Sequence, residues 1–337
     1  MNAKRDKARK GTAAGSPSNV DVKLSPTMTG RAAATAILAC ALKRALIHER
    51  KVRRGAGGRS LHDYRVLLRR ARAALSQIKG VFPEDLTARF KEDLSSLCRA
   101  ANAARDLETH LEGKEKYLAA LPESLAPQVN IFFNDLDRRY KAERIALSKR
   151  LGTKKFAGVI TRWLDFLKGA AVVKLPKSEN AKKPSRALAK KFILKSAAKL
   201  AAKLGSLDPL DSSPEDLHKL RILCKKTRYL LEFFASILPK KEHELVTKRL
   251  IRLQDALGHF NDLTMHRKFM EARLAETASH KTGAAAMAAA VGAIIASLHL
   301  EREQARRPIK AAFNELRSKQ VAEAFKKICQ HNLLRRN

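Results

Sequence analysis

The chain has 337 residues, 45% of them hydrophobic, so it is long enough to bury a large core in one or two domains. Its 69 Lys and Arg residues against 33 Asp and Glu residues give a net charge of +36. A folded protein with such an excess repels itself, so the charge indicates a polyanionic partner: nucleic acid, anionic lipid or a phosphate polymer. The four cysteines are widely spaced and form no Cys/His cluster, which argues against a zinc site or a disulfide framework.

The composition of residues 1–27, basic residues mixed with Gly, Ser and Pro, is typical of a disordered basic tail. Beyond it, apolar residues recur at helical spacing and no stretch shows the period-two alternation of a strand, so the predicted fold class is all-α. The first half, residues 28–170, is expected to hold helices at about 29–53, 61–78, 84–101, 105–121, 127–151 and 155–168. A Pro- and Lys-rich linker, 171–185, leads to the second half, 186–331, with helices at about 186–204, 214–234, 241–258, 261–278, 284–306 and 308–330.

The most apolar run, Ala284–Leu300, is rich in alanine and contains Gly292, Ser297 and His299. It is short and weakly hydrophobic for a membrane span, so we expect a helix buried in a bundle and no membrane partner. The polar N-terminus lacks the apolar centre of a signal peptide, and we expect a cytoplasmic protein.

One pattern occurs twice, in Leu61–Ile78 and Leu217–Phe234. In each copy, His and Arg or Lys residues are spaced i, i+3, i+7 and i+10, so they form a column beside an apolar helix face. An offset of 156 residues aligns His62 with His218 and continues without a gap over roughly sixty residues. The sequence therefore predicts one helical module used twice.

A column of cations on a helix is most often a solvated face. The return of the same column in a strongly basic chain favours binding of a polyanion instead, because guanidinium groups grip phosphate oxygens in pairs and lysines add point charges. Glu232, at the position of Ser76, is expected to pair with Arg228 one turn earlier. His110 and His266 are expected to be partly buried histidines, and Asp106 and Asp262 to orient a neighbouring arginine or cap a helix.

Catalytic signatures are missing from the sequence. It contains no phosphate-binding glycine loop, no D-x-D cluster, no G-x-S-x-G and no H-E-x-x-H. We therefore expect neither catalytic residues, nor a metal, nor a cofactor.

The chain resembles the CHAD family, the conserved-histidine alpha-helical domain. H-D-Y-R-V-L-L-R-R-A-R and H-K-L-R-I-L-C-K-K-T-R are similar to its H-x-x-R-V-x-x-R-R-x-R signature, and L-G-H-F-N-D-L and A-N-A-A-R-D-L to its L-G-x-x-R-D-L element. The resemblance covers residues 30–330 and implies two tandem four-helix-bundle-like halves of long antiparallel helices, related by a pseudo-two-fold axis around a basic groove or pore. It also implies binding of inorganic polyphosphate, without hydrolysis, and location on polyphosphate granules in bacterial cells.

Carried over residue by residue, the resemblance assigns polyphosphate binding to the cations of both copies of the signature: His62, Arg65, Arg69, Arg70, Arg72, His218, Arg221, Lys225, Lys226 and Arg228. Four further cations are added as candidates: Lys43, Lys199, Arg105 and Arg252. The sequence departs from the family pattern at Ala101, Asn102 and Asn261, so the two halves are not expected to be equivalent.

The alternative function is binding of nucleic acid, as in a nucleoid-associated protein. Against it stand the low aromatic content of 5%, which leaves few rings for base stacking, and the lack of a groove-reading motif. Weak nucleic-acid binding is kept as a secondary expectation, and the sequence does not determine the oligomeric state.

Overall fold

The computed structural model describes residues 20–277 and 284–330. Every regular element in these ranges is helical, which confirms the predicted all-α class. Extended pairing within them is confined to an isolated bridge between Thr29 and Pro184.

The helices of the first part of the chain are α1 (Gly30–Arg53), α2 (Arg59–Gln77), α3 (Glu84–Ala100), α4 (Asn102–Leu111), α5 (Lys114–Ala120), the 3-10 turn η2 (Glu123–Leu125), α6 (Ala126–Gly152), α7 (Val159–Lys168) and α8 (Ala170–Val173). They are followed by α9 (Ser185–Gly205), α10 (Pro214–Phe233), the 3-10 turn η3 (Ala235–Ile237), α11 (Lys240–Thr277), α12 (Ala284–Gln304), α13 (Arg306–Leu316) and α14 (Lys319–Gln330).

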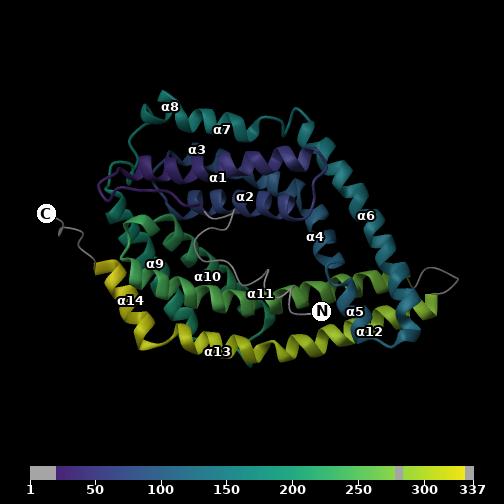
Figure 1. Cartoon of the computed structure of the whole chain (residues 1–337). Helices are drawn as coiled ribbons and strands as arrows, with labels where there is room; N and C mark the ends of the chain where they lie inside the picture. Colours follow the sequence, from purple (N-terminus) through teal and green to yellow (C-terminus); the bar gives the residue numbers. More distant parts are fainter. Residues whose placement is uncertain (1–19, 278–283, 331–337) are drawn as a thin grey trace.

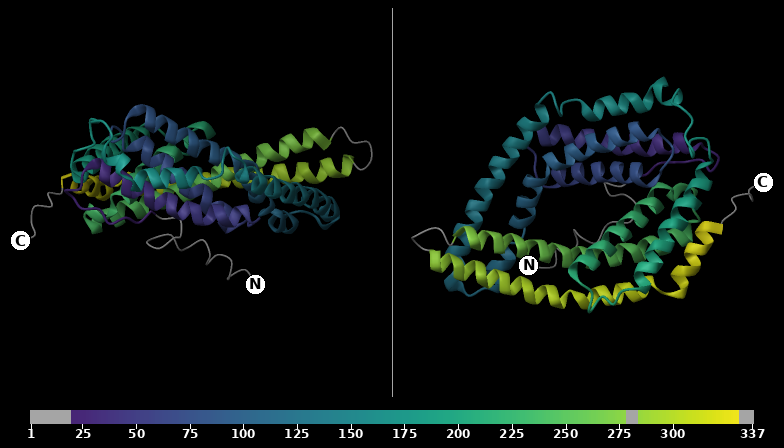
Figure 2. Two further views of the ribbon diagram at one scale, coloured as in Figure 1. Left: turned by 90° about the horizontal axis from the view of Figure 1, so that it is seen from above. Right: turned by 180° about the vertical axis from the view of Figure 1, so that it is seen from behind.

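Two groups of helices form opposite sides of a flattened molecule. Helices α1, α2 and α3 lie together on one side, and α9 to α13 lie on the other (Figure 1). Helix α6 runs down the edge that joins them and packs on α1 near one end and on α12 near the other. The view from above shows how thin the arrangement is (Figure 2). Direct packing of α2 on α10 also joins the two groups.

Helices α2 and α10 form because the apolar residues of each share one face, and a side-chain cap also specifies the start of α10. In α2 the buried stripe contains Leu61, Tyr64 and Leu68, all fully buried. At the start of α10, the Ser213 hydroxyl accepts a hydrogen bond from the Asp216 backbone N–H at 3.1 Å, and Pro214 follows the cap.

Helix α11 corrects the predicted break near Gly258. The structure has one helix of 38 residues where two were expected. Leu253, Leu257, Phe260 and Leu263 are all buried on either side of the glycine, so the apolar stripe continues through it. Packing of this stripe outweighs the roughly 1 kcal/mol that a glycine costs in a helix interior. Conversely, the helix expected at 308–330 divides into α13 and α14.

The predicted disordered tail is wrong for its last residues. Val20 and Leu24 are 1% and 8% exposed, and the Leu24 backbone N–H donates to the Ser236 hydroxyl at 2.9 Å. The apolar residues of this short segment give it enough burial to dock against the second half of the chain. Residues 1–19 lie outside the described ranges.

The predicted linker at 171–185 is anchored to the first half. The Arg31 guanidinium donates to the carbonyls of Leu175 at 2.9 Å and Pro176 at 2.5 Å. The Asn180 backbone N–H donates to the Gly80 carbonyl at 2.7 Å, and Asn180 itself is 1% exposed. These contacts hold the connection against the start of α1 and the turn that follows α2.

One helical stretch, Ala284–Leu316, is long and apolar enough to cross a membrane by length and composition, with a mean hydropathy of 1.6. Only 22% of its apolar window is buried. In α12 the buried positions are Ala290, Val291, Ile294 and Leu298, which form one face. The expected burial in a bundle therefore holds for this face of α12 and not for its whole surface.

Candidate functional site

The two signature helices bring cations together across their interface. Arg69 of α2 is exposed and lies close enough to Arg221 and Lys225 of α10 for its charge to act on both. We call Arg69, Arg221 and Lys225 the cation cluster. Burial is the main cause that lowers the pKa of Arg221, and repulsion from Arg69 adds to it, while Asp262 opposes it.

Lys225 shows the strongest effect in this cluster. Its pKa is lowered from 10.5 to about 7, first by burial and then by repulsion from Arg221, Arg69 and Arg228, with Asp262 acting in the opposite direction. At neutral pH a lysine in this state is only partly charged, and a nearby anion that offsets the repulsion raises its charge. The cluster therefore has the electrostatic properties of an anion-binding site.

Arg65, one turn before Arg69, is half-buried. Its Nη1 donates to the Ala101 carbonyl at 3.0 Å and lies 4.0 Å from an Asp106 carboxylate oxygen. Asp106 thus lies beside an arginine, as expected for an orienting carboxylate.

The two signature histidines lie at the surface but have different neighbours. Partial desolvation lowers the pKa of His62, and the charge of Arg105 lowers it further. In the second half, His218 Nδ1 donates to Asn261 Oδ1 at 2.7 Å. Asn261 aligns with Arg105 in the repeat, so the same position repels one histidine and orients the other.

Arg70 corrects the predicted site, because it does not face the open side of α2. It is 5% exposed, and its Nη1 lies 2.5 Å from a Glu232 carboxylate oxygen of α10. Its guanidinium also lies 4.9 Å from the centre of the Tyr229 ring. Successive helix residues differ by about 100° in direction, so the neighbour of exposed Arg69 turns into the interface.

Glu232 pairs with Arg228, as the sequence predicted, at 3.6 Å. The same carboxylate therefore receives one arginine from its own helix and Arg70 from α2, and Tyr229 lies under both guanidinium groups. The role of Tyr229 and the link to Arg70 were missed from the sequence. The sequence offered one indication of these contacts, the carboxylate of Glu232 among the cations of its helix, and helical spacing related it to Arg228 only.

The remaining signature cations lie in separate surroundings. Arg72 is half-buried toward α3, where burial raises the pKa of the Cys98 thiol and a hydrogen bond with Arg72 opposes that rise. Lys226 is exposed. These two residues are not placed in the cation cluster by any contact of the described chain.

The four added candidates also separate. Arg105 pairs with Glu108 at 2.6 Å and with Glu112 at 3.1 Å, and Arg252 pairs with Glu315 of α13. Lys199 lines a shallow hollow beside Lys203 and Lys219, whereas Lys43 is an exposed residue of α1.

The fold and this site define an all-helical protein with a cation cluster where its two signature helices meet. The sequence model of the CHAD domain family matches residues 36–271 of this chain. The chain belongs to the CHAD domain family, which is associated with polyphosphate binding and is generally a binding domain.

Two solved structures share the fold. The chain is 22% identical to the CHAD domain from the plant Ricinus communis, with a TM-score of 0.71 over 90% of this chain and 97% of that one. It is 18% identical to PptA from Streptomyces chartreusis, with a TM-score of 0.63 over 86% of this chain and 100% of that one. None of the curated proteins matches the sequence.

We predict that Glu232→Gln lowers the free energy of unfolding by about 3 kcal/mol, because it removes the carboxylate charge that pairs with buried Arg70 at 2.5 Å. Urea denaturation followed by circular dichroism measures the change. The matched control is Glu92→Gln, which removes an exposed pair with Arg99 and should cost no more than a few tenths of a kcal/mol. Equal losses in the two variants would contradict the assigned role of Glu232.

Proposed function

We propose that this protein binds inorganic polyphosphate, without hydrolysing it, in a basic groove formed along α2 and α10. The observation that carries the proposal is the cation cluster, in which repulsion from Arg69 and Arg221, added to burial, keeps the pKa of Lys225 near 7. Like charges held together in a fold cost free energy, and a bound polyanion removes that cost. A linear phosphate polymer supplies closely spaced negative charge along its whole length.

Polyphosphate is favoured over nucleic acid by the nature of the cluster. Its arginines can grip phosphate oxygens in pairs, and no aromatic ring belongs to it. The rings nearest the signature residues, such as Tyr229, are buried in the α2–α10 interface and lie under arginines. Binding of this kind would carry the protein to polyphosphate granules in the cytoplasm of a bacterial cell.

Competition tests the proposal most directly. Labelled long-chain polyphosphate is bound to the full chain and displaced with unlabelled polyphosphate, duplex DNA or tRNA at equal phosphate concentration. We expect polyphosphate to displace the label at a concentration at least about tenfold lower than either nucleic acid. Equal displacement would favour the nucleic-acid alternative, and release of phosphate during the incubation would contradict binding without hydrolysis.

We predict that Arg69→Gln with Arg221→Gln weakens polyphosphate binding at least about tenfold and lowers the slope of log affinity against log salt by about two. The physical reason is that each cluster arginine neutralises phosphate and releases counterions. The control, Arg89→Gln with Lys168→Gln, removes the same charge at exposed positions of α3 and α7. Similar losses in both double variants would mean that only the net charge matters.

We predict that polyphosphate affinity falls as the pH rises from 6 to 8.5. Because the pKa of free Lys225 is about 7, this side chain is mostly protonated at pH 6 and mostly neutral at pH 8.5, and a bound anion raises its pKa. Binding therefore takes up protons, and the affinity loss should reach about tenfold. Fluorescence titration at each pH measures it with long chains, whose internal phosphates do not titrate in this range.

The matched variant is Lys225→Arg, which keeps the charge at every pH of this range. Its affinity should depend much less on pH than that of the parent chain. An unchanged pH dependence in this variant would contradict the role given to Lys225.

A further inference from the structure

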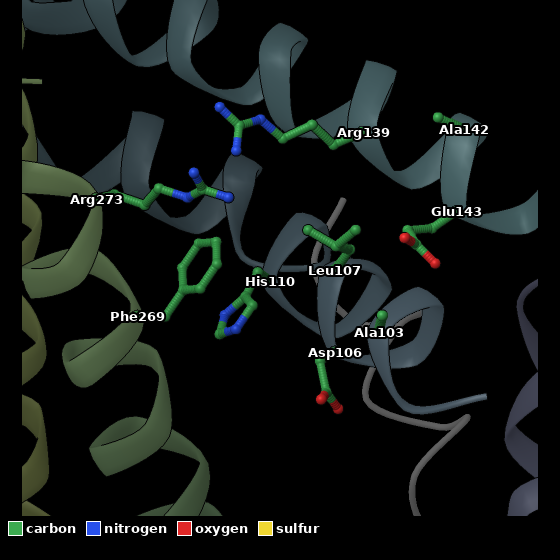
Figure 3. Close-up of a pocket in the computed structure, with 9 residues that line it drawn as sticks. All are labelled: Ala103, Asp106, Leu107, His110, Arg139, Ala142, Glu143, Phe269 and Arg273. Carbon is green, nitrogen blue, oxygen red and sulfur yellow. The ribbon is translucent and has the colours of Figure 1, made fainter. Parts of the chain in front are cut away.

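A pocket of about 460 Å³ lies between α4, α6 and α11, and it contains none of the residues of the two signature columns. Its walls come from three helices that are far apart in the sequence, and its volume is in the range of small-molecule sites. The lining residues are Ala103, Asp106, Leu107, His110, Arg139, Ala142, Glu143, Phe269 and Arg273, all shown in Figure 3.

The charges in the pocket are separated by sign. Figure 3 shows the guanidinium groups of Arg139 and Arg273 together at one end, and the carboxylates of Glu143 and Asp106 away from them, beyond and below Leu107. Arg139 uses its Nε to pair with Asp135 at 2.8 Å, and the Arg273 guanidinium lies 5.3 Å from the centre of the Phe269 ring. The arrangement suits a molecule with an anionic head, an apolar body and hydrogen-bond donors at its far end.

Two buried polar atoms of the pocket residues lack a hydrogen-bond partner in the described chain: His110 Nδ1 and Glu143 Oε2. His110 is only 8% exposed, and its ring stacks on Phe269 with 3.8 Å between the ring centres. Buried polar atoms are nearly always paired in folded proteins, so these two indicate that something else supplies their partners.

His110 is held in its neutral form. Burial is the main cause that lowers its pKa to about 3, and the neighbouring His266 and Arg273 lower it further. A neutral imidazole with an unpaired ring nitrogen can donate or accept one hydrogen bond, which suits an uncharged polar group of a ligand. The buried state of His110 agrees with the sequence expectation, but its unpaired nitrogen was not anticipated.

We propose that this pocket binds a nucleoside monophosphate. The phosphate lies against Arg139 and Arg273, on the guanidinium N–H groups that their pairs with Asp135 and Glu276 do not use. The ribose follows the phosphate and lies beside His110, whose unpaired ring nitrogen is within reach of a ribose hydroxyl. The base lies beyond the ribose on Leu107, and an exocyclic amino group such as that of adenine donates to Glu143 Oε2 at the far end. The proposal does not rest on polyphosphate binding, because the site shares no residue with the cation cluster.

The test is titration of the full chain with AMP at physiological salt, followed by calorimetry. We expect AMP to bind with a dissociation constant below about 1 mM, and adenosine or inorganic phosphate to bind at least about tenfold more weakly. The pocket is overturned as a nucleotide site if AMP binds no more tightly than inorganic phosphate, or does not bind.

Neighbouring arginines provide a matched pair of variants. Arg139→Gln should weaken AMP binding at least about tenfold, whereas Arg138→Gln should change it less than about twofold, because Arg138 pairs with the same Asp135 but does not line the pocket. Equal losses would reduce the effect to general attraction by a basic chain and overturn the site. A second variant, Ala142→Phe, fills the pocket from an exposed helix position and should abolish binding without unfolding the chain. Persistence of AMP binding in this variant would also overturn the proposal.

The Arg69→Gln with Arg221→Gln chain separates this site from the cation cluster. AMP should bind to it as tightly as to the parent chain. A loss of AMP binding there would place the nucleotide in the cluster and not in the pocket.

Discussion

The ion pair between Arg70 and the partly buried carboxylate of Glu232 is the interaction on which the site depends. A Glu232 carboxylate oxygen accepts a hydrogen bond from Arg70 Nη1 of α2 at 2.5 Å, and the other lies 3.6 Å from Arg228 Nε of α10. Charges taken out of water are tolerated only when they are paired, so this contact admits few relative positions of the two helices. Once Arg70 is held in the interface, helical geometry turns Arg69 to the exposed side, beside Arg221 and Lys225.

The chain has a net charge of +36, yet the cation cluster differs from many of its other cations, because those are paired with nearby carboxylates. Arg105 and Arg252 are predicted-site cations that are matched by carboxylates of their own surroundings. In the cation cluster the nearest charges are mainly positive, and together with burial, which is the larger cause, they lower the pKa of Lys225. Cations that are paired with carboxylates of the fold therefore differ from the cations of the cluster, which are proposed to bind a ligand. This difference cannot be read from a count of lysines and arginines.

The halves of the chain differ where their sequences diverge. Helices α3 and α4 are separate, whereas the corresponding residues of the second half lie within the continuous helix α11. Helix α4 packs on α6, and α11 extends far enough to bring Phe269 and Arg273 beside it. The pocket between α4, α6 and α11 depends on this difference, since its walls combine α4 and α6 with the far part of the continuous helix α11.

The sequence by itself determined the helical class, the position of the two signature helices and the cationic column on each, because these depend on residue spacing within a single helix. It also indicated that Glu232 would meet Arg228, which is a contact one turn apart. Only the tertiary structure decided that Arg70 turns inward, that residues 20–27 dock on the second half, and that Arg69 approaches Lys225. These outcomes depend on which helices pack together and at what rotation, and contacts between residues 150 or more positions apart leave no periodic signal in the chain.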